Sequence, residues 1–126
     1  MKPATIKAII KRPGEFGRVI SVQDHYTAFC LTLGTEESFE AAVGEIVVND
    51  MTFLFLKESQ APEIRPCLAP AFYHGFQTQV YYEGKMMQVN DLRGTVLIVG
   101  SHDPDDDTMI YQDAPSRLLR HALDIV

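Results

Sequence analysis

The feature that most constrains the fold is an uninterrupted apolar stretch between two glycines, which reads GTVLIVG. A run of aliphatic and β-branched residues without polar alternation is typical of a strand that is buried on both faces. The sequence therefore predicts a central strand over residues 95–99. Val96 and Ile98 should face one side of the sheet, and Leu97 and Val99 should face the other.

Length and composition fit one domain. The chain has 126 residues, of which 46% are hydrophobic and 22% are charged. A chain of this kind can bury a core without disulfides or metals. Its two cysteines, Cys30 and Cys67, form no CxxC pair, so we expect free thiols and no zinc site. We predict a single α+β domain over residues 1–126, with no cofactor.

The other strands are predicted from alternating apolar and polar residues and from the turns between them. They cover residues 5–11, 18–22, 42–48, 51–57, 76–82, 86–89 and 108–112. In the first of them, TIKAIIK, the residues Lys7, Ile9 and Lys11 share one mostly polar face. Short turns favour antiparallel pairing. The predicted fold is α+β, with a mostly antiparallel sheet of six to eight strands packed on one face against one or two helices.

Two helices are predicted from spacing and capping. In HYTAFCLTL, residues 25–33, apolar side chains recur at i, i+3, i+4 and i+7, between Asp24 as N-cap and Gly34 as C′ residue. The second helix follows Asp113 as N-cap. Its apolar face consists of Leu118, Leu119, Ala122 and Ile125.

The order of these elements carries a family resemblance. The chain has a Pro-Gly turn at residues 13–14, a Glu-Gly-Lys turn at 83–85, the GTVLIVG strand, and an acidic turn at 103–107 before the last helix. In this order it resembles a family of small uncharacterised proteins, a domain of unknown function found in bacteria, conjugative elements and phages. The resemblance implies an accessory protein of a mobile element or phage, and it implies no catalytic residue.

Charge and hydropathy exclude several classes of partner. The net charge is -6 and the pI is about 5.1, whereas nonspecific nucleic-acid binding needs clustered Lys and Arg. No segment approaches the roughly 18 apolar residues of a membrane span, and residues 1–12 lack the apolar region of a signal peptide. We therefore expect a cytoplasmic protein that binds neither membranes nor nucleic acid, and whose acidic surface is compatible with a basic protein partner.

The densest acidic cluster, DPDDD at residues 103–107, imitates the start of a calcium loop. The glycine expected at the sixth position is Thr108, and the glutamate expected at the twelfth is Ala114. We predict a solvated turn and no metal site. His102 and Asp103 would form a general-base pair only if a third group and a pocket converged on them.

A group of aromatic residues follows a long Pro-containing loop at residues 58–71. Loops of this length are often functional, and aromatic side chains dominate the energetics of interfaces. We expect Tyr73, His74 and Tyr81 to lie at the surface as contacts for an unidentified protein partner. The neighbouring apolar side chains that should point inward are Phe76, Val80 and Tyr82.

The sequence thus favours a noncatalytic accessory protein that binds another macromolecule, and it leaves two alternatives open. One is a small enzyme or nucleotide-binding protein with a site near the 58–74 loop. The other is an acidic decoy that mimics nucleic acid. A deep pocket with converging polar groups would favour the enzyme, a flat aromatic patch the binding module, and regular rows of carboxylates the decoy. The sequence makes no prediction of oligomeric state.

Overall fold

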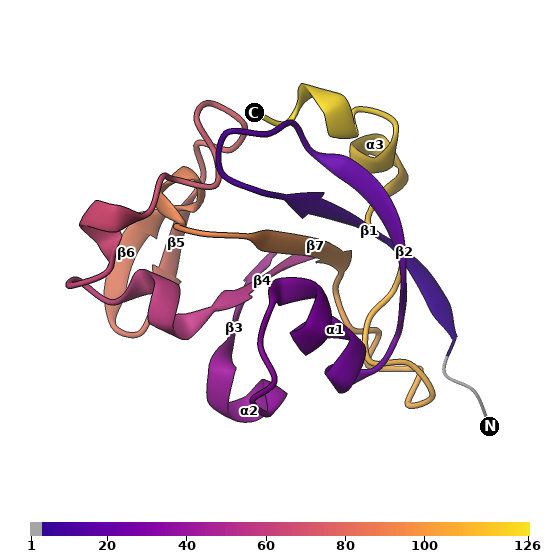
Figure 1. The fold of residues 1–126 in the computed structure, drawn as a ribbon. Helices are drawn as coiled ribbons and strands as arrows, with labels where there is room; N and C mark the ends of the chain where they lie inside the picture. The colour runs from indigo at the N-terminus through magenta and orange to yellow at the C-terminus, as the bar shows by residue number, and fades with distance from the viewer. Residues whose placement is uncertain (1–3) are drawn as a thin grey trace.

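The computed structural model describes residues 4–126 and is built around an antiparallel sheet of five strands (Figure 1). The strand order is β2-β1-β7-β4-β3, and a separate two-stranded sheet pairs β5 with β6. The strands are β1 (Thr5–Lys11), β2 (Arg18–Gln23), β3 (Val43–Val48), β4 (Met51–Leu56), β5 (Gln79–Tyr82), β6 (Lys85–Gln88) and β7 (Val96–Gly100). The predicted α+β antiparallel architecture is confirmed, but the main sheet has five strands rather than six to eight.

The apolar run lies at the centre of this sheet, as predicted. All five residues of β7 are buried. Ile98 pairs with Ile9 of β1 on one side and with Phe53 of β4 on the other. A strand with neighbours on both sides and cores on both faces needs an unbroken apolar sequence, which is what β7 has.

Each face of the sheet carries its own hydrophobic core. On one face, Phe53 and Ile98 pack against residues 71–92 and the C-terminal region. On the other face, Leu97 packs in one cluster with Phe29 and Leu33 of the first helix. Helical segments therefore cover both faces of the sheet, whereas the sequence predicted helices on one face only.

The helices are short. They are α1 (Tyr26–Leu33), α2 (Phe39–Ala42) and α3 (Ser116–Leu119), with 3-10 turns η1 (Lys57–Gln60), η2 (Arg65–Cys67), η3 (Val89–Asp91) and η4 (Ala122–Asp124). The predicted loop 58–71 thus contains two 3-10 turns. No helix among residues 4–126 is long and apolar enough to cross a membrane.

The first helix ends as predicted but begins differently. Gly34 terminates it with φ 94°, a left-handed conformation that glycine adopts without strain. At the start, the Nδ1 atom of His25 accepts a hydrogen bond from the Thr27 amide, at 3.2 Å, so His25 is the N-cap. The prediction of Asp24 as N-cap is wrong, because its carboxylate is bonded to another part of the chain.

Asp24 also explains why the strand predicted at residues 108–112 is wrong. Its two carboxylate oxygens accept hydrogen bonds from the amides of Ile110 and Tyr111, at 2.7 and 2.9 Å. These amides are therefore unavailable for a strand ladder. Only a single bridge, between Gly100 and Gln112, joins this segment to the sheet.

The predicted C-terminal helix is reduced to α3 and η4. Asp113 does not cap it, because its Oδ1 atom accepts a hydrogen bond from the Lys7 amide at 2.8 Å. The four predicted apolar residues nevertheless reach the core: Ala122 and Ile125 are buried, and Leu118 and Leu119 pack against the same cluster.

Tertiary packing accounts for two differences from the predicted strands. The strand expected over residues 76–82 begins only at Gln79, and Phe76 instead stacks edge-on against Phe53 and Phe72, each at 5.3 Å between ring centroids. The mostly polar face predicted for β1 does not exist, because Ile9 is buried and Lys11 is only 1% exposed.

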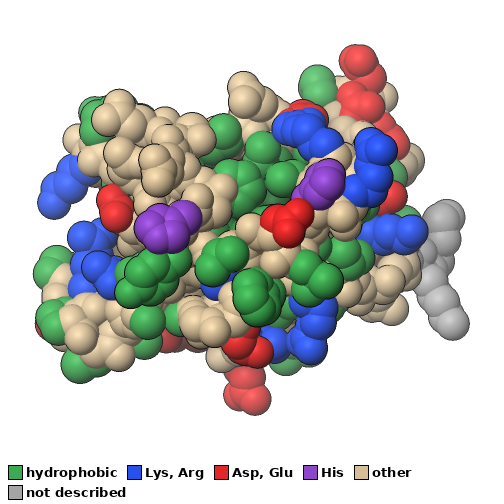
Figure 2. Space-filling view, turned by 90° about the horizontal axis from the view of Figure 1, so that it is seen from above, with side chains coloured by type: hydrophobic (Ala, Val, Ile, Leu, Met, Phe, Trp, Pro, Cys, Tyr) green, Lys and Arg blue, Asp and Glu red, His purple; other side chains and the backbone are tan. Residues whose placement is uncertain are grey.

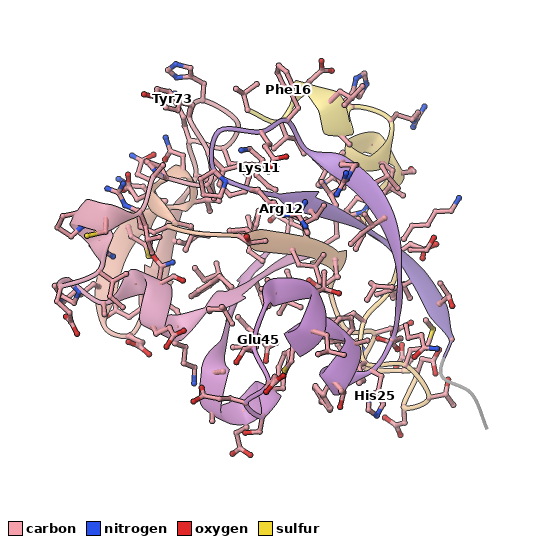
Figure 3. All side chains as sticks on the ribbon, in the orientation of Figure 1. Lys11, Arg12, Phe16, His25, Glu45 and Tyr73 are labelled. Atoms are coloured by element: carbon pink, nitrogen blue, oxygen red, sulfur yellow. The ribbon has the colours of Figure 1, made fainter. Side chains whose placement is uncertain are left out.

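The two ends of the molecule differ in character. Lys11, Arg12, Phe16 and Tyr73 lie at the end that carries the C-terminus, whereas Glu45 lies toward the other end (Figure 3). Seen from above, the first end exposes hydrophobic side chains among charged ones (Figure 2). Phe16 is 65% exposed and Tyr73 is 68% exposed.

Candidate functional site: an acidic cleft

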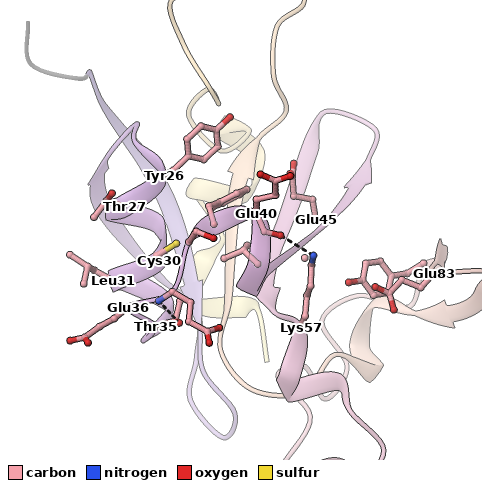
Figure 4. Close-up of a pocket in the computed structure, with 16 residues that line it drawn as sticks. Tyr26, Thr27, Cys30, Leu31, Thr35, Glu36, Glu40, Glu45, Lys57 and Glu83 are labelled. Atoms are coloured by element: carbon pink, nitrogen blue, oxygen red, sulfur yellow. Dashed lines mark hydrogen bonds between the residues drawn. The ribbon is translucent and has the colours of Figure 1, made fainter.

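A cleft of about 1050 Å³ lies at the α1–α2 end of the molecule (Figure 4). It is bounded by α1, by the connector and α2 that follow, by the start of β3, and by the turn between β5 and β6. Segments that are remote in the sequence therefore form its walls.

Glutamates dominate the charged lining of the cleft. Five carboxylates line it, and Lys57 is the one Lys or Arg among its lining residues. The glutamates are Glu36, Glu37, Glu40, Glu45 and Glu83. Lys57 does not neutralise them by a direct ion pair: its Nζ atom donates to the backbone carbonyl oxygen of Glu40, at 3.1 Å. Carboxylates thus outnumber basic side chains in the lining by five to one, which favours a cationic ligand.

Local hydrogen bonds fix the connector and α2, which together supply three of these glutamates. The Thr35 hydroxyl accepts a bond from the Glu37 amide at 3.1 Å. Ser38 caps α2 by accepting from the Ala41 amide at 3.3 Å. Both are standard uses of a short hydroxyl side chain at a turn or helix start. They hold the acidic connector in a defined path along the cleft.

A buried tyrosine holds the fourth carboxylate. The hydroxyl of Tyr111 donates to the Oε2 atom of Glu45 at 2.5 Å. Burial, together with the Glu45 carboxylate, raises the pKa of Tyr111 well above its usual value, so this phenol stays a proton donor. Glu45 is itself exposed, so the bond orients a carboxylate that remains accessible from the cleft.

Aromatic rings supply the apolar part of the cleft. Tyr26 and Phe39 pack at 4.7 Å between ring centroids, and Tyr82 packs edge-on against Phe55 at 5.2 Å. Burial and the neighbouring Glu83 raise the pKa of Tyr82 to about 12, so its ring is uncharged at neutral pH. Carboxylates beside aromatic faces suit an organic cation, which gains both charge pairing and cation–π attraction.

A metal ion is a poorer fit. Within residues 4–126, no group of three or more Asp, Glu, His or Cys side chains has an arrangement that could hold a metal ion. The cleft glutamates are therefore spread along the walls, which favours an extended cationic ligand over a single ion.

The three residues predicted as partner contacts all lie at the surface. Tyr73 and His74 are exposed, with ring centroids 5.6 Å apart. Tyr81 is 70% exposed and pairs across the β5–β6 hairpin with Met86. Among the described residues, Tyr81 stacks on neither of the other two rings. Their role as contacts stays a prediction.

The inward-pointing side chains were predicted correctly. Val80 is buried, and Phe76 and Tyr82 are half-buried against the core. Tyr82 reaches both the core and the cleft, a double role that strand alternation alone did not indicate.

His102 does not form the general-base pair that was considered. Its Nδ1 atom lies 3.1 and 3.0 Å from the carbonyl oxygens of Met109 and Ile110. Since carbonyls only accept, Nδ1 carries the proton there and His102 ties down the turn. Among the described residues, His102 lines neither the acidic cleft nor the two smaller hollows near residues 10–18.

The acidic turn uses its carboxylates for its own structure. Asp103 accepts a bond from the Asp105 amide, and Asp106 accepts from both the amide and the hydroxyl of Thr108. The bonds from Thr108 lower the pKa of Asp106. These are turn contacts of the kind that Asp commonly makes.

We therefore predict that Ca²⁺ does not bind this turn specifically. Addition of millimolar Ca²⁺ should leave the melting temperature unchanged, because two of the carboxylates already serve the turn and the later ligands of a calcium loop are absent. Titration calorimetry is the check. Micromolar binding that disappears in Asp105→Ala would contradict the prediction.

Comparisons with protein-family models, curated proteins and solved structures found no match to this chain. The family resemblance therefore stays a prediction, and the function must be inferred from the site itself.

The cleft was not predicted from the sequence. One signal was present: four of its glutamates fall within residues 36–45, beside two aromatic-containing segments. The fifth, Glu83, joins them only because β5 packs close to β3, and no local pattern predicts that packing.

Proposed function

We propose that this protein is a noncatalytic binding protein whose acidic cleft holds a positively charged segment of another protein. The observation that carries the proposal is the lining of the cleft, with five glutamates against one lysine and aromatic rings between them. An arginine or lysine side chain would pair with the carboxylates and lie against Tyr26 or Tyr82.

The size of the cleft supports a polypeptide ligand. Its volume of about 1050 Å³ lies just above the roughly 300–1000 Å³ that is usual for small-molecule sites. Its walls come from four separate elements, so a ligand several residues long would contact all of them. The negative charge of the acidic cleft would also raise the association rate with a basic partner.

The two alternatives have less support. No residue of the 58–74 segment lines the cleft, and the hollow that touches this segment has a volume of only about 210 Å³. For the decoy, the glutamates gather in a concave cleft rather than in rows along an outer face. A cleft of this shape suits a protruding basic segment better than it imitates a nucleic-acid backbone.

The test is binding of a short fluorescent peptide in which arginine and glycine alternate, measured by anisotropy. The triple variant Glu40→Gln, Glu45→Gln, Glu83→Gln removes cleft charge while it keeps side-chain size. We expect its affinity for the peptide to be at least tenfold lower than that of the native protein. The same peptide with citrulline in place of arginine should bind neither protein.

A matched variant distinguishes the effect of losing charge in the cleft from the effect of losing overall negative charge. Glu63→Gln, Asp105→Asn, Asp107→Asn removes the same amount of negative charge from exposed positions outside the cleft. Its affinity should stay within about twofold of the native value. Equal losses in the two variants, or no binding of the arginine peptide by the native protein, would overturn the proposal.

A further inference from the structure

Lys11 is an unusual lysine, because it is a charged residue type with almost no contact with water. It ends β1 and is 1% exposed. It lies beneath the end of the molecule where Phe16 and Tyr73 are exposed (Figure 3). Lysine is rarely buried this fully unless it is paired with a negative charge.

Lys11 has no such pairing within the described range: it forms no salt bridge with any of residues 4–126. Its Nζ atom donates one hydrogen bond, to the carbonyl oxygen of Arg12 at 2.6 Å, and lies 5.9 Å from the centroid of the Phe72 ring. Burial lowers the pKa of Lys11, and the Glu15 carboxylate opposes this only in part. The neutral amine is therefore more abundant than on an exposed lysine.

Lys11 also lines a small hollow. The hollow has a volume of about 210 Å³, and its walls are mostly apolar or aromatic: Phe16, Pro70, Ala71 and Tyr73 are among them. Glu15 is the one carboxylate side chain that lines it together with Lys11. An amine, a carboxylate and apolar walls are thus brought together, remote from the acidic cleft, with which this hollow shares no residue.

We propose that this hollow is a binding site for a small, uncharged aldehyde, which condenses reversibly with the Lys11 amine to form an imine. The neutral Nζ atom attacks the carbonyl carbon, the C=O π electrons move to oxygen, and one proton passes from nitrogen to that oxygen. In the resulting carbinolamine the nitrogen lone pair forms the C=N bond as the hydroxyl leaves, and the second nitrogen proton passes to the departing oxygen to give water. Amine and aldehyde thus give imine and water, and nothing is oxidised or reduced.

Each wall has a part in this chemistry. A desolvated lysine is the usual form of an amine nucleophile. Glu15 lines the same hollow but forms no salt bridge with Lys11, so it would pass protons between nitrogen and oxygen through a bridging water. The apolar walls favour an uncharged ligand, and the Glu15 carboxylate disfavours an anionic one.

The experiment is reductive trapping of the full chain with benzaldehyde and cyanoborohydride near neutral pH, followed by peptide mass mapping. Lys7, Lys57 and Lys85 are less buried than Lys11 and serve as internal controls. We expect trapping at Lys11 to be faster than at these three and to saturate with benzaldehyde concentration, whereas theirs rises linearly. With glyoxylate, a charged aldehyde, the preference for Lys11 should be lost.

Two variants test the roles of Lys11 and Glu15. Lys11→Met should abolish only the saturable component. Glu15→Gln should slow trapping at Lys11 at least tenfold and leave the saturating concentration of benzaldehyde unchanged. If Lys11→Met does not fold, the sites of benzaldehyde trapping in the native protein and in Glu15→Gln still test the proposal. An unmodified Lys11, or trapping there without saturation or at the rate of Lys7, would overturn the proposal.

Discussion

Replacement of Ile98 by alanine is expected to lower the free energy of unfolding by about 2–5 kcal/mol. Ile98 is fully buried in β7, between Ile9 on β1 and Phe53 on β4. Truncation would remove buried methyl groups and leave a cavity that neighbours held by three strands cannot close. Urea denaturation, followed by circular dichroism, measures the loss as a lower midpoint at unchanged slope.

Val47→Ala is the matched control. Val47 is also an aliphatic residue of the same sheet, but it lies on the edge strand β3 and is 64% exposed. Its replacement should change the free energy of unfolding by no more than about 0.5 kcal/mol. If Ile98→Ala kept the native midpoint, β7 could not be the buried centre of the sheet.

Elements that are specified by nearby residues could be predicted from the sequence. The apolar run indicated β7, and helical spacing together with Gly34 indicated α1 and its end. The turn after β5 was predicted from Glu-Gly-Lys, and Gly84 indeed has φ 79°. In each case the signal and the structure lie within a few residues of each other.

Elements that depend on distant partners could not be predicted. Lys11 has the sequence pattern of a solvated face, yet residues 70–73 and the 12–17 turn enclose it. The segment 108–112 has the composition of a strand, yet two of its amides donate hydrogen bonds to the carboxylate of Asp24, more than eighty positions earlier. The cleft likewise needs Glu83 beside β3. A long-range hydrogen bond from a side chain to backbone amides, or the packing of a hairpin against a distant strand, leaves no periodic signal in a single sequence.

Replacement of Asp24 by alanine is the second change for which we expect a large effect. Asp24 is 7% exposed, and its carboxylate is the acceptor for the amides of Ile110 and Tyr111. Alanine would leave both amides without this partner. Because hydrogen bonds to charged groups each contribute about 1.5–3 kcal/mol, we expect the loss of two to lower the free energy of unfolding by about 3–6 kcal/mol. Thermal and urea unfolding measure the loss.

Asp24→Ala should also alter the acidic cleft. Tyr111 packs edge-on against Phe29 at 5.4 Å and donates to Glu45. When the 110–111 segment is no longer held, the Tyr111 hydroxyl loses its fixed position and Glu45 loses its orientation. We therefore expect Asp24→Ala to weaken binding of the arginine peptide at temperatures where the variant is still folded.

A serine at position 24 distinguishes the observed tether from the helix cap that the sequence suggested. Serine is as good an N-cap as aspartate, so a capping role would leave Asp24→Ser close to native stability. A single hydroxyl on a shorter side chain cannot accept from both amides at once, so the tether requires a loss close to that of alanine. Native stability in Asp24→Ser would refute the tether as the reason why residues 110 and 111 join no strand ladder.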